Sequence, residues 1–291
     1  MIVFYLLIPS MLMLISVFGL PLIRYAWLSF HADSVLTGLQ PIANGGANWI
    51  RLMNDYRYWQ DLIQTMRFAI ASVGIELVLG VVVALLLNQP MRKRGVIRSI
   101  SLIPWALPTT VMALGWRWIF NTPYGPFDQI TSTLSGVSLN ILGNPSIAWI
   151  GLVYADVWKT TPFVALIVLA GLQSIPGDLY EACTLEGGSS WTCFRRITLP
   201  LLKPYLGLAA MFRLAQAFGV FDLVQVMTGG GPASSSESIA LYAYWNALRF
   251  LDFGYSATIM IASFILLSTI VGFSWWLILL LNQRRALTVT E

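Results

Sequence analysis

The sequence predicts an all-α integral membrane protein, and three of its properties lead to that class. Of its 291 residues, 57% are hydrophobic and only 10% are charged. A soluble domain carries about 25% charged residues, so most of this surface is expected to face lipid rather than water. In lipid the backbone satisfies its own hydrogen bonds only as helices or as a closed barrel. The apolar stretches are long and continuous rather than alternating, so helices are predicted.

Six segments are long and apolar enough to cross a membrane, since one crossing takes about 20 predominantly apolar residues. These segments lie at about residues 2–28, 66–87, 100–120, 147–172, 205–227 and 257–281. The segments expected outside the membrane on one side are about residues 29–65, 121–146 and 228–256. None of them is long enough for a folded domain of its own, so residues 1–291 are expected to form a single transmembrane domain.

Basic residues gather in the segments that follow the second, fourth and sixth spans. They are Arg92, Lys93, Arg94, Arg98, Arg195, Arg196, Lys203, Arg284 and Arg285. The positive-inside rule places such segments in the cytosol, so both termini are expected to be cytosolic. The net charge of +4 therefore indicates topology rather than a surface for nucleic acid.

The composition also excludes several kinds of chemistry. The chain contains one histidine, His31, and no C-x-x-C pair, so no metal site is expected. It contains no G-x-x-x-x-G-K-S/T phosphate-binding loop, so any use of ATP must come from a partner protein. The two cysteines, Cys183 and Cys193, lie in one segment expected in the reducing cytosol, and both are expected to be free thiols.

The cytosolic segment 173–204 is expected to form a helix, a sharp turn and a second helix. Asp178 and Glu181 have the spacing of a capping box, which predicts a helix start at Asp178. Gly187 and Gly188 are expected to end that helix, because a left-handed turn suits glycine. The residues expected to start and to close the second helix are Ser189 or Ser190 and, before the fifth span, Pro200 and Pro204.

This segment resembles the E-A-A motif, E-A-A-x3-G-x9-I-x-L-P, of binding-protein-dependent ABC importer permeases. The matching residues are Glu181, Ala182, Gly187, Ile197, Leu199 and Pro200. The sequence departs from the usual motif at three positions, where Cys183, Glu186 and Gly188 replace an alanine, an aspartate and an alanine. The resemblance implies that the first short helix docks in a groove of an ATPase subunit, with Glu181 and Gly187 central to the contact.

Two further stretches resemble the carbohydrate permeases related to the larger pore subunit of the maltose system. Residues 221–232 match F-D-x5-T-G-G-G-P, and residues 158–163 match W-x-x-x-P-F. Members of this subfamily lie in the bacterial plasma (inner) membrane. The resemblance implies four partners besides the bilayer: a sister permease, two copies of an ABC ATPase, an extracytoplasmic sugar-binding protein and the sugar itself.

The resemblance also implies how the chemistry is divided among these partners. ATP and Mg would be bound by the ATPase dimer, and no cofactor is expected in this chain. The sugar stays open between a disaccharide such as trehalose or sucrose, a glycosylated polyol such as glucosylglycerol, and a glycerol phosphate. The spans contain no dense Arg/Lys cluster, which argues mildly against a phosphorylated substrate.

Several charged side chains fall inside predicted spans, where a charge costs about 2.5–3.5 kcal/mol and usually faces protein or water. Asp156 and Lys159 share a helix face, so they either form a mutual ion pair or one of them contacts a sugar. Arg213 either pairs with Glu76 or holds the bundle together in another way. Asp222 either lines a pathway or anchors the glycine-rich loop that follows it.

A sugar pathway needs polar groups for hydroxyls and aromatic faces for C–H surfaces. The residues expected to line it are Tyr154, Asp156, Trp158, Lys159, Thr160, Phe163, Gln216, Val220, Phe221 and Asp222. Five of them, Asp156, Thr160, Phe163, Gln216 and Val220, are also favoured by the resemblance. Pro162 and Gly219 are expected to loosen the fourth and fifth spans beside this site.

Two other classes of function compete with the importer permease. An ion-coupled transporter of a small polar solute would use Glu76 or Asp156 as a titrating carboxylate and would often contain inverted repeats, of which no convincing example is seen. A membrane-embedded enzyme needs a constellation of catalytic side chains, which one histidine and scattered acids do not supply. The sequence therefore favours a permease subunit without catalytic residues of its own.

Overall fold

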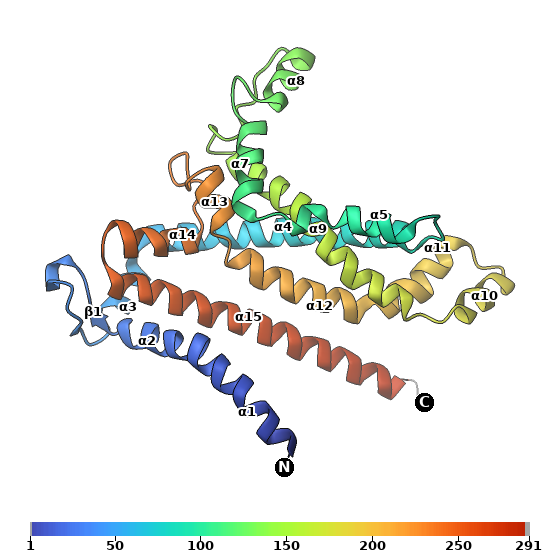
Figure 1. Cartoon of the computed structure of the whole chain (residues 1–291), viewed down its shortest axis with the longest axis horizontal. Coiled ribbons are helices and arrows are strands. Elements are labelled where there is room, and N and C mark those ends of the chain that lie inside the picture. The colour runs from blue at the N-terminus through green and yellow to red at the C-terminus, as the bar shows by residue number, and fades with distance from the viewer. Residues whose placement is uncertain (1, 289–291) are drawn as a thin grey trace. The chain divides into compact units, whose positions relative to one another are not determined.

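The computed structural model describes residues 2–288 and shows a mostly helical chain (Figure 1). Residue 1 and residues 289–291, at the two ends predicted to be cytosolic, lie outside the described residues. The chain divides into two compact units. The first unit contains the residues up to Ile63 together with Glu237–Gly272, and the second contains Gln64–Ser236 and the residues from Phe273 onward.

The first unit combines the N-terminal helices with two helices from late in the chain. Its elements are α1 (Ile2–Leu14), η1 (Ile15–Gly19), α2 (Leu20–Leu28), β1 (His31–Ala32), η2 (Val35–Thr37), β2 (Ile42–Ala43), α3 (Ala47–Asn54), the start of α4 (Tyr56–Asn88), α14 (Ile239–Tyr244), η4 (Trp245–Arg249) and the start of α15 (Phe253–Thr288). The Thr258 hydroxyl of α15 donates to the Ser29 carbonyl, at 3.1 Å, which ties α15 to the end of α2.

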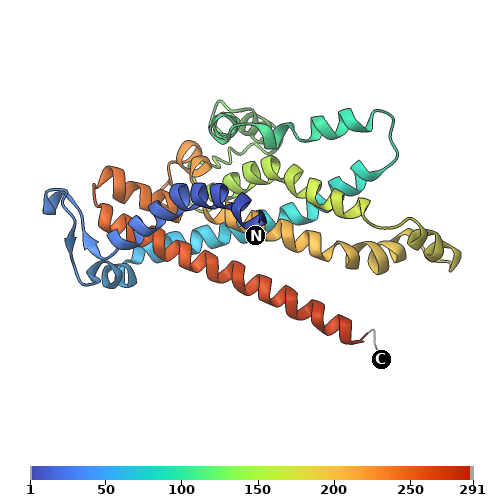
Figure 2. The same cartoon turned by 60° about the horizontal axis from the view of Figure 1, so that its bottom comes forward.

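The second unit contains the rest of α4 and the segments that carry the predicted sites. Its other helices are α5 (Arg94–Ser101), α6 (Ile103–Ala106), α7 (Thr109–Ile119), α8 (Pro126–Ser135), α9 (Ala148–Gln173), α10 (Asp178–Leu185), α11 (Ser190–Cys193), η3 (Phe194–Thr198), α12 (Leu199–Phe218) and α13 (Asp222–Met227). Figure 2 shows α9 and α12 side by side, with α10 and α11 forming a tip at one end of this unit.

The core of the second unit is an apolar cluster between α4, α9 and α12. Its buried members are Ala84, Leu87, Val164, Ala165, Val168, Leu169, Leu172, Leu202 and Ala209. Two glycines let the helices approach closely. A side chain on Gly80 of α4 would meet Val164, and one on Gly171 of α9 would meet Tyr205. Small residues at such contacts are how membrane helices gain packing without a hydrophobic driving force between them.

A Gly80→Ala substitution is therefore expected to push α4 away from α9. A Cβ atom at Gly80 would lie 2.5 Å from the Val164 Cγ1 atom and 3.3 Å from the Ala165 backbone nitrogen. Overpacking of this kind costs about 1–3 kcal/mol. Gly74 on the same helix is the matched control, because a Cβ atom there has nothing within 4 Å. Thermal unfolding in detergent should show destabilisation for Gly80→Ala only, and equal behaviour of the two variants would contradict this packing.

Five helices among the described residues are long and apolar enough to cross a membrane. They are Leu7–Leu28, Tyr56–Asn88, Ala148–Gln173, Ser190–Phe218 and Phe253–Ser274. They cover the first, second, fourth, fifth and sixth predicted spans, although the fifth begins earlier than predicted and α12 ends at Phe218. Gly219 ends α12 as its C-cap, whereas α9 continues through Pro162. None of the apolar window in Leu7–Leu28 is buried, as expected of a surface that faces lipid or another membrane protein.

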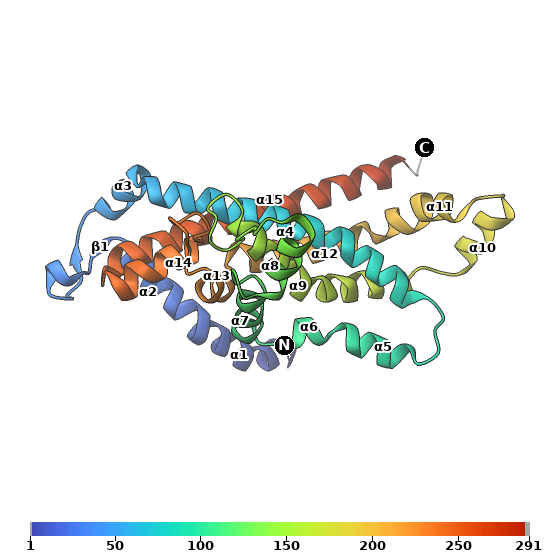
Figure 3. The same cartoon turned by 90° about the horizontal axis from the view of Figure 1, so that it is seen from above.

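The third predicted span, residues 100–120, is not one continuous helix. Its residues form the end of α5, then α6 and α7, and α7 turns away from the line of α5 and α6 (Figures 1 and 3). The interruption lies at Leu107 and Pro108, whose backbone is extended, with ψ angles of 138° and 133°. Pro108 lacks an N–H and disfavours a helical conformation at the residue before it, so the break follows from the sequence.

A cluster of polar side chains holds the segments of the first unit that lie outside the spans. Asp55, the residue before α4, accepts hydrogen bonds from the hydroxyls of Tyr242, at 2.5 Å, and Tyr255. Arg57 forms an ion pair with Glu237 at 2.8 Å. Although burial opposes it, the two tyrosine hydroxyls and two backbone amides hold the pKa of Asp55 below its usual value. Burial and the Asp55 carboxylate raise the pKa of Tyr242 to about 12.

The low pKa of Asp55 predicts a pH dependence of stability with a defined sign. A carboxylate with a lowered pKa stabilises the folded state above its ordinary pKa, and this contribution is lost as the pH falls through the folded-state value. An Asp55→Asn variant should therefore unfold at a lower temperature than the wild type at pH 7. The gap should narrow as the pH falls below the ordinary value of 3.8. A gap that stays constant with pH in thermal unfolding would show that Asp55 does not contribute as a carboxylate.

Candidate functional site

The first helix of segment 173–204 is α10, at the tip of the second unit (Figures 1 and 2). The predicted cap is wrong: the helix is preceded by Gly177, and no side chain caps it. Gly177 itself has helical dihedral angles, φ −60° and ψ −36°, so Asp178 lies within the first turn rather than at the cap position. Asp178 and Glu181 both lie in this turn, where negative side chains interact favourably with the helix dipole.

The turn after α10 has the predicted form. Gly187 has a φ of +78°, in the left-handed region, and the Gly188 amide donates to the Cys183 carbonyl at 2.8 Å. Ser189 then caps α11, because its hydroxyl accepts the Thr192 amide at 3.3 Å. A helix, a sharp turn and a helix are therefore confirmed.

The sequence predicts that the second helix closes at Pro200 and Pro204, and this prediction is wrong. Residues Ser190–Phe218 run as one helical segment through α11, η3 and α12. The π-helical turn η3, Phe194–Thr198, leads directly into α12, and Pro200 lies in the first turn of α12. Pro200 has no N–H to donate to the preceding turn, and the π-helical turn directly before it is where the helix accommodates that missing hydrogen bond. The tip is thus continuous with the fifth span.

The two cysteines of this loop are joined in a disulfide, so the expectation of free thiols is wrong in this structure. Cys183 lies on α10 and Cys193 on α11, and the reversal at Gly187 brings their Cα atoms to 6.1 Å. That distance is within the range that a disulfide requires. The Tyr180 and Thr198 hydroxyls share a hydrogen bond of 2.9 Å between the same two arms of the loop.

The residues predicted to dock an ATPase differ in their exposure. Glu181, Ala182, Glu186 and Gly187 are exposed, Cys183 and Gly188 are half-buried, and so are Ile197, Leu199 and Pro200. The exposed group therefore lies on α10 and the turn, while the I-x-L-P end of the motif packs at the start of the fifth span. Leu185, which is 89% exposed at the end of α10, was not among the predicted docking residues. An apolar residue two positions before the predicted glycine turn is the signal in the sequence that could have identified it.

Charged residues from three helices meet in the core of the second unit. Arg213 of α12 donates to Glu76 of α4 at 2.5 Å and to Asp156 of α9 at 2.9 Å. It also donates to the Gln216 side chain, at 2.8 Å, and Glu76 accepts the Thr160 hydroxyl at 2.7 Å. Arg213 is 2% exposed and Glu76 is fully buried. The pairing of Arg213 with Glu76, one of the two alternatives, is thus the one found.

Lys159 does not pair with Asp156, which Arg213 engages instead. The Lys159 ammonium donates to the backbone carbonyls of Leu107, at 2.5 Å, and Trp105, at 3.3 Å. These carbonyls lie at the break between α6 and α7. The mutual ion pair considered from the sequence is therefore wrong, because a helix break with unpaired carbonyls lies within reach of the lysine.

The residues of the predicted pathway differ in their exposure. Tyr154, Trp158, Gln216 and Asp222 are exposed, Lys159, Phe163, Val220 and Phe221 are half-buried, and Asp156 and Thr160 are buried. Trp116 of α7 contacts Tyr154 and Trp158, with ring centroids 5.1 and 5.7 Å apart. Trp105 of α6 stacks on Phe163 at 5.6 Å. Both tryptophans therefore lie against aromatic residues of the predicted pathway.

The glycine-rich loop after α13 is held by hydroxyl groups rather than by Asp222. The Thr228 hydroxyl accepts the Gly230 amide at 3.2 Å and the Ser236 hydroxyl at 2.9 Å. Asp222 lies in the first turn of α13 with an exposed side chain. The anchoring role considered for Asp222 therefore belongs to Thr228 and Ser236.

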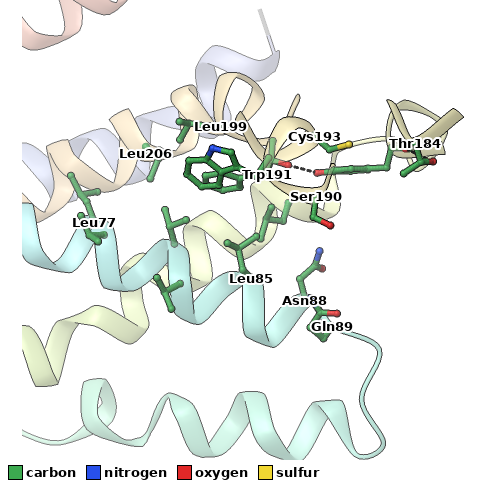
Figure 4. A pocket seen from close by; sticks show the side chains of 17 residues that line it. Leu77, Leu85, Asn88, Gln89, Thr184, Ser190, Trp191, Cys193, Leu199 and Leu206 are labelled. Atoms are coloured by element: carbon green, nitrogen blue, oxygen red, sulfur yellow. Dashed lines mark hydrogen bonds between the residues drawn. The ribbon is translucent and has the colours of Figure 1, made fainter. Parts of the chain in front are cut away.

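An apolar groove of about 980 Å³ lies beside the helix–turn–helix loop (Figure 4). Leu77 and Leu85 of α4 face Trp191 of α11 and Leu199 of α12 across it. Asn88, Gln89, Thr184 and Ser190 supply polar groups at the end near the loop. The groove therefore adjoins the tip and contains no charged side chain among its lining residues.

Helices long and apolar enough to cross a membrane, two of them joined by a helix–turn–helix loop, are typical of a transport permease. The family model described as "Binding-protein-dependent transport system inner membrane component" matches residues 76–285. This match covers most of the chain, including both sites, so the chain belongs to this family of inner-membrane transport components.

Named relatives cover nearly the whole chain. The trehalose/maltose transport system permease protein MalF of Thermococcus litoralis is 43% identical over 90% of this chain and 88% of its own length. The sulfoquinovosyl glycerol transport system permease protein SmoG of Agrobacterium fabrum is 34% identical over 90% of this chain and 85% of its own. A chain of a bacterial ABC transporter that imports alginate has the same fold, with a TM-score of 0.82, 19% identity and coverage of 95% and 94%.

Proposed function

We propose that this chain is one of two permease subunits of an ATP-driven, binding-protein-dependent sugar importer. The observation that carries the proposal is α10, an exposed helix with Glu181 and Leu185 on its surface, held at the tip of a helical segment that continues into the fifth span. A movement imposed on α10 would pass through η3 into α12, which carries Arg213 and Gln216. This is the mechanical link that a transporter driven by a separate ATPase requires.

The partners and orientation follow from the same proposal. Two copies of an ABC ATPase would bind ATP and Mg and dock on the α10 tips of this chain and of a sister permease. A sugar-binding protein would deliver substrate from the extracytoplasmic side. The chain would cross the bacterial plasma membrane six times, with the third crossing made by the broken helix α5–α7 and both termini in the cytosol. The clustering of basic residues supports this orientation.

The exposed aromatic side chains of α9 are proposed to line the sugar pathway. Tyr154 and Trp158 would present ring faces for the C–H surfaces of a sugar, and the exposed Gln216 of α12 would present an amide for its hydroxyls. The ion pairs of Arg213 with Glu76 and Asp156 would hold α4, α9 and α12 together. Asp156 and Thr160 are thus proposed as the second layer of the pathway.

The relatives favour a disaccharide or a glycosylated polyol over a glycerol phosphate. The MalF protein at 43% identity is named for trehalose and maltose, and SmoG, at 34%, for a glycosylated glycerol. We propose a disaccharide or a glycosylated polyol, such as trehalose, sucrose or glucosylglycerol, for this chain.

Mass spectrometry of what co-purifies with the chain from gently solubilised native membranes tests the assembly. An ABC ATPase, a second permease of this family and a sugar-binding protein are expected. Direct ligand screening of that binding protein then identifies the sugar. Recovery of this chain alone, under conditions that preserve other such complexes, would overturn the proposal and favour an ion-driven transporter.

A Glu181→Lys substitution is expected to reduce sugar uptake by about tenfold or more, because a like charge placed in a protein contact costs several kcal/mol. Asp178→Lys is the matched control, since it makes the same charge change in the same exposed first turn but outside the motif. Uptake into proteoliposomes is the measurement, and a reciprocal charge change in the ATPase groove should restore it. If both variants lose the same share of sugar uptake, the loss comes from the overall charge of α10 and not from a contact of Glu181.

A further inference from the structure

The disulfide between Cys183 and Cys193 closes the helix–turn–helix loop into a small ring. Its two cysteines are ten residues apart in sequence, one on α10 and one on α11, and the turn at Gly187 lies between them. Cys193 is 5% exposed, whereas Cys183 is half-buried. Cys183 is thus the more accessible residue of the two.

The backbone around the pair is shaped to admit it. A Cβ atom on Gly188 would lie 2.6 Å from the Cys183 Sγ atom and 2.7 Å from the Cys183 carbonyl oxygen. Contacts that short essentially do not occur, so any side chain at position 188 would displace the sulfur from its position. The Cys183 sulfur can therefore occupy its position only because residue 188 is a glycine.

Little else holds α10 against the rest of the loop. α10 contains no buried residue. Besides the backbone turn, the contact between the arms includes the single hydrogen bond of 2.9 Å between Tyr180 and Thr198. Apolar burial is the usual source of helix docking, and here it is nearly absent. The covalent bond is therefore the strongest connection between the helix proposed to receive force and the helix proposed to transmit it.

We propose that Cys183 and Cys193 form a thiol-modification site, a disulfide that a cellular dithiol reduces and that sets how tightly the permease is coupled to its ATPase. This inference rests on the proposed function, which places the loop in the cytosol and connects it to the ATPase. With the bond closed, α10 moves together with α11. With the bond open, α10 can shift on its turn, and part of the ATPase movement is lost before it reaches α12.

Reduction of the disulfide proceeds by two successive thiol–disulfide exchanges. One thiolate of the dithiol attacks the Cys183 Sγ atom, the bond between the two cysteine sulfurs breaks, and Cys193 leaves as a thiolate that takes up a proton. The second thiolate of the dithiol then attacks the other dithiol sulfur, which is bonded to Cys183 in the mixed disulfide; the dithiol closes its own disulfide and Cys183 leaves as a thiolate that is protonated. The protein gains two thiols, and the dithiol becomes a disulfide.

The first measurement is thiol labelling of the purified complete transporter with a maleimide, followed by mass spectrometry. Neither cysteine should be labelled before treatment, and both should be labelled after treatment with dithiothreitol. Gly188→Ala should leave both thiols open without reductant. Gly177→Ala, at a position of the same loop where a Cβ atom meets nothing within 4 Å, should behave as the wild type. Labelling of both cysteines in the untreated wild type would overturn the proposal.

The second measurement is sugar uptake per ATP hydrolysed in proteoliposomes. Dithiothreitol should lower this ratio about fivefold, the lower end of typical coupling between sites. A Cys183→Ser/Cys193→Ser variant should show the low ratio at once and no further response to the reductant. An unchanged ratio after reduction, or an equal response in the double variant, would overturn the proposal. The labelling experiment does not need the ATPase. If the two cysteines form a disulfide in a chain that recruits no ATPase, the proposed function and the coupling role are both overturned. The disulfide itself would still be established.

Discussion

An Arg213→Met variant is expected to unfold well below the wild-type temperature. The substitution keeps the length of the side chain but leaves Glu76 and Asp156 as two negative charges facing each other in the core of the second unit, where Arg213 now bonds both. Removing one partner of a buried ion pair costs about 3–5 kcal/mol, because the remaining charge stays desolvated and unpaired. For a domain of this size the loss corresponds to a fall of about 10 °C in the melting temperature.

Two further variants separate the charge effect from a loss of packing. A triple variant, Glu76→Gln/Asp156→Asn/Arg213→Met, removes all three charges and should recover most of the lost stability, since replacing a whole buried charge group is often close to neutral. Arg196→Met, at an exposed position of η3, should have little effect. Thermal unfolding in detergent, followed by size-exclusion chromatography, is the measurement. A triple variant as unstable as Arg213→Met alone would show that the arginine acts through packing rather than through its charge.

Five of the six predicted spans and the turn of the loop could be predicted because each depends on local properties of the sequence. Continuous apolar residues define a membrane helix wherever they occur, and Gly187 needs its left-handed conformation whatever surrounds it. The pairing of Arg213 could be narrowed only to alternatives, because its partner Glu76 is 137 residues away and on another helix. Which charges meet is set by the packing of α4, α9 and α12, which a single sequence does not specify.

The error about the free thiols has a physical origin. In the sequence, Cys183 and Gly188 are two separate departures from the usual motif. The structure shows that the two positions share one space, since a side chain on Gly188 would meet the Cys183 sulfur. The expectation of free thiols came from the compartment alone, and the distance between two cysteines on opposite arms of a turn is not visible in the sequence. The same holds for Lys159, whose partners lie 52 and 54 residues away.

A Lys159→Met variant is expected to destabilise the break in the third predicted span and to reduce sugar uptake strongly. Lys159 supplies the donors for the Leu107 and Trp105 carbonyls, which the extended backbone at Pro108 leaves outside the helical pattern. A carbonyl left without a donor costs about 1–3 kcal/mol where no water replaces the lost donor, as in the lipid. Hydrogen exchange of the peptide around residues 103–112 should therefore become faster, and uptake should fall about tenfold.

Two variants decide whether Lys159 acts on the backbone or on the sugar. Lys159→Arg keeps a cationic donor and should retain slow exchange at residues 103–112, whereas Lys203→Met, an exposed lysine on α12, should change neither measurement. A lysine that served only to bind substrate would raise the sugar concentration needed for half-maximal uptake and leave hydrogen exchange of the break unchanged. Faster exchange in the absence of sugar would instead place its role in the fold of the third crossing, because the carbonyls need their donor whether or not substrate is present.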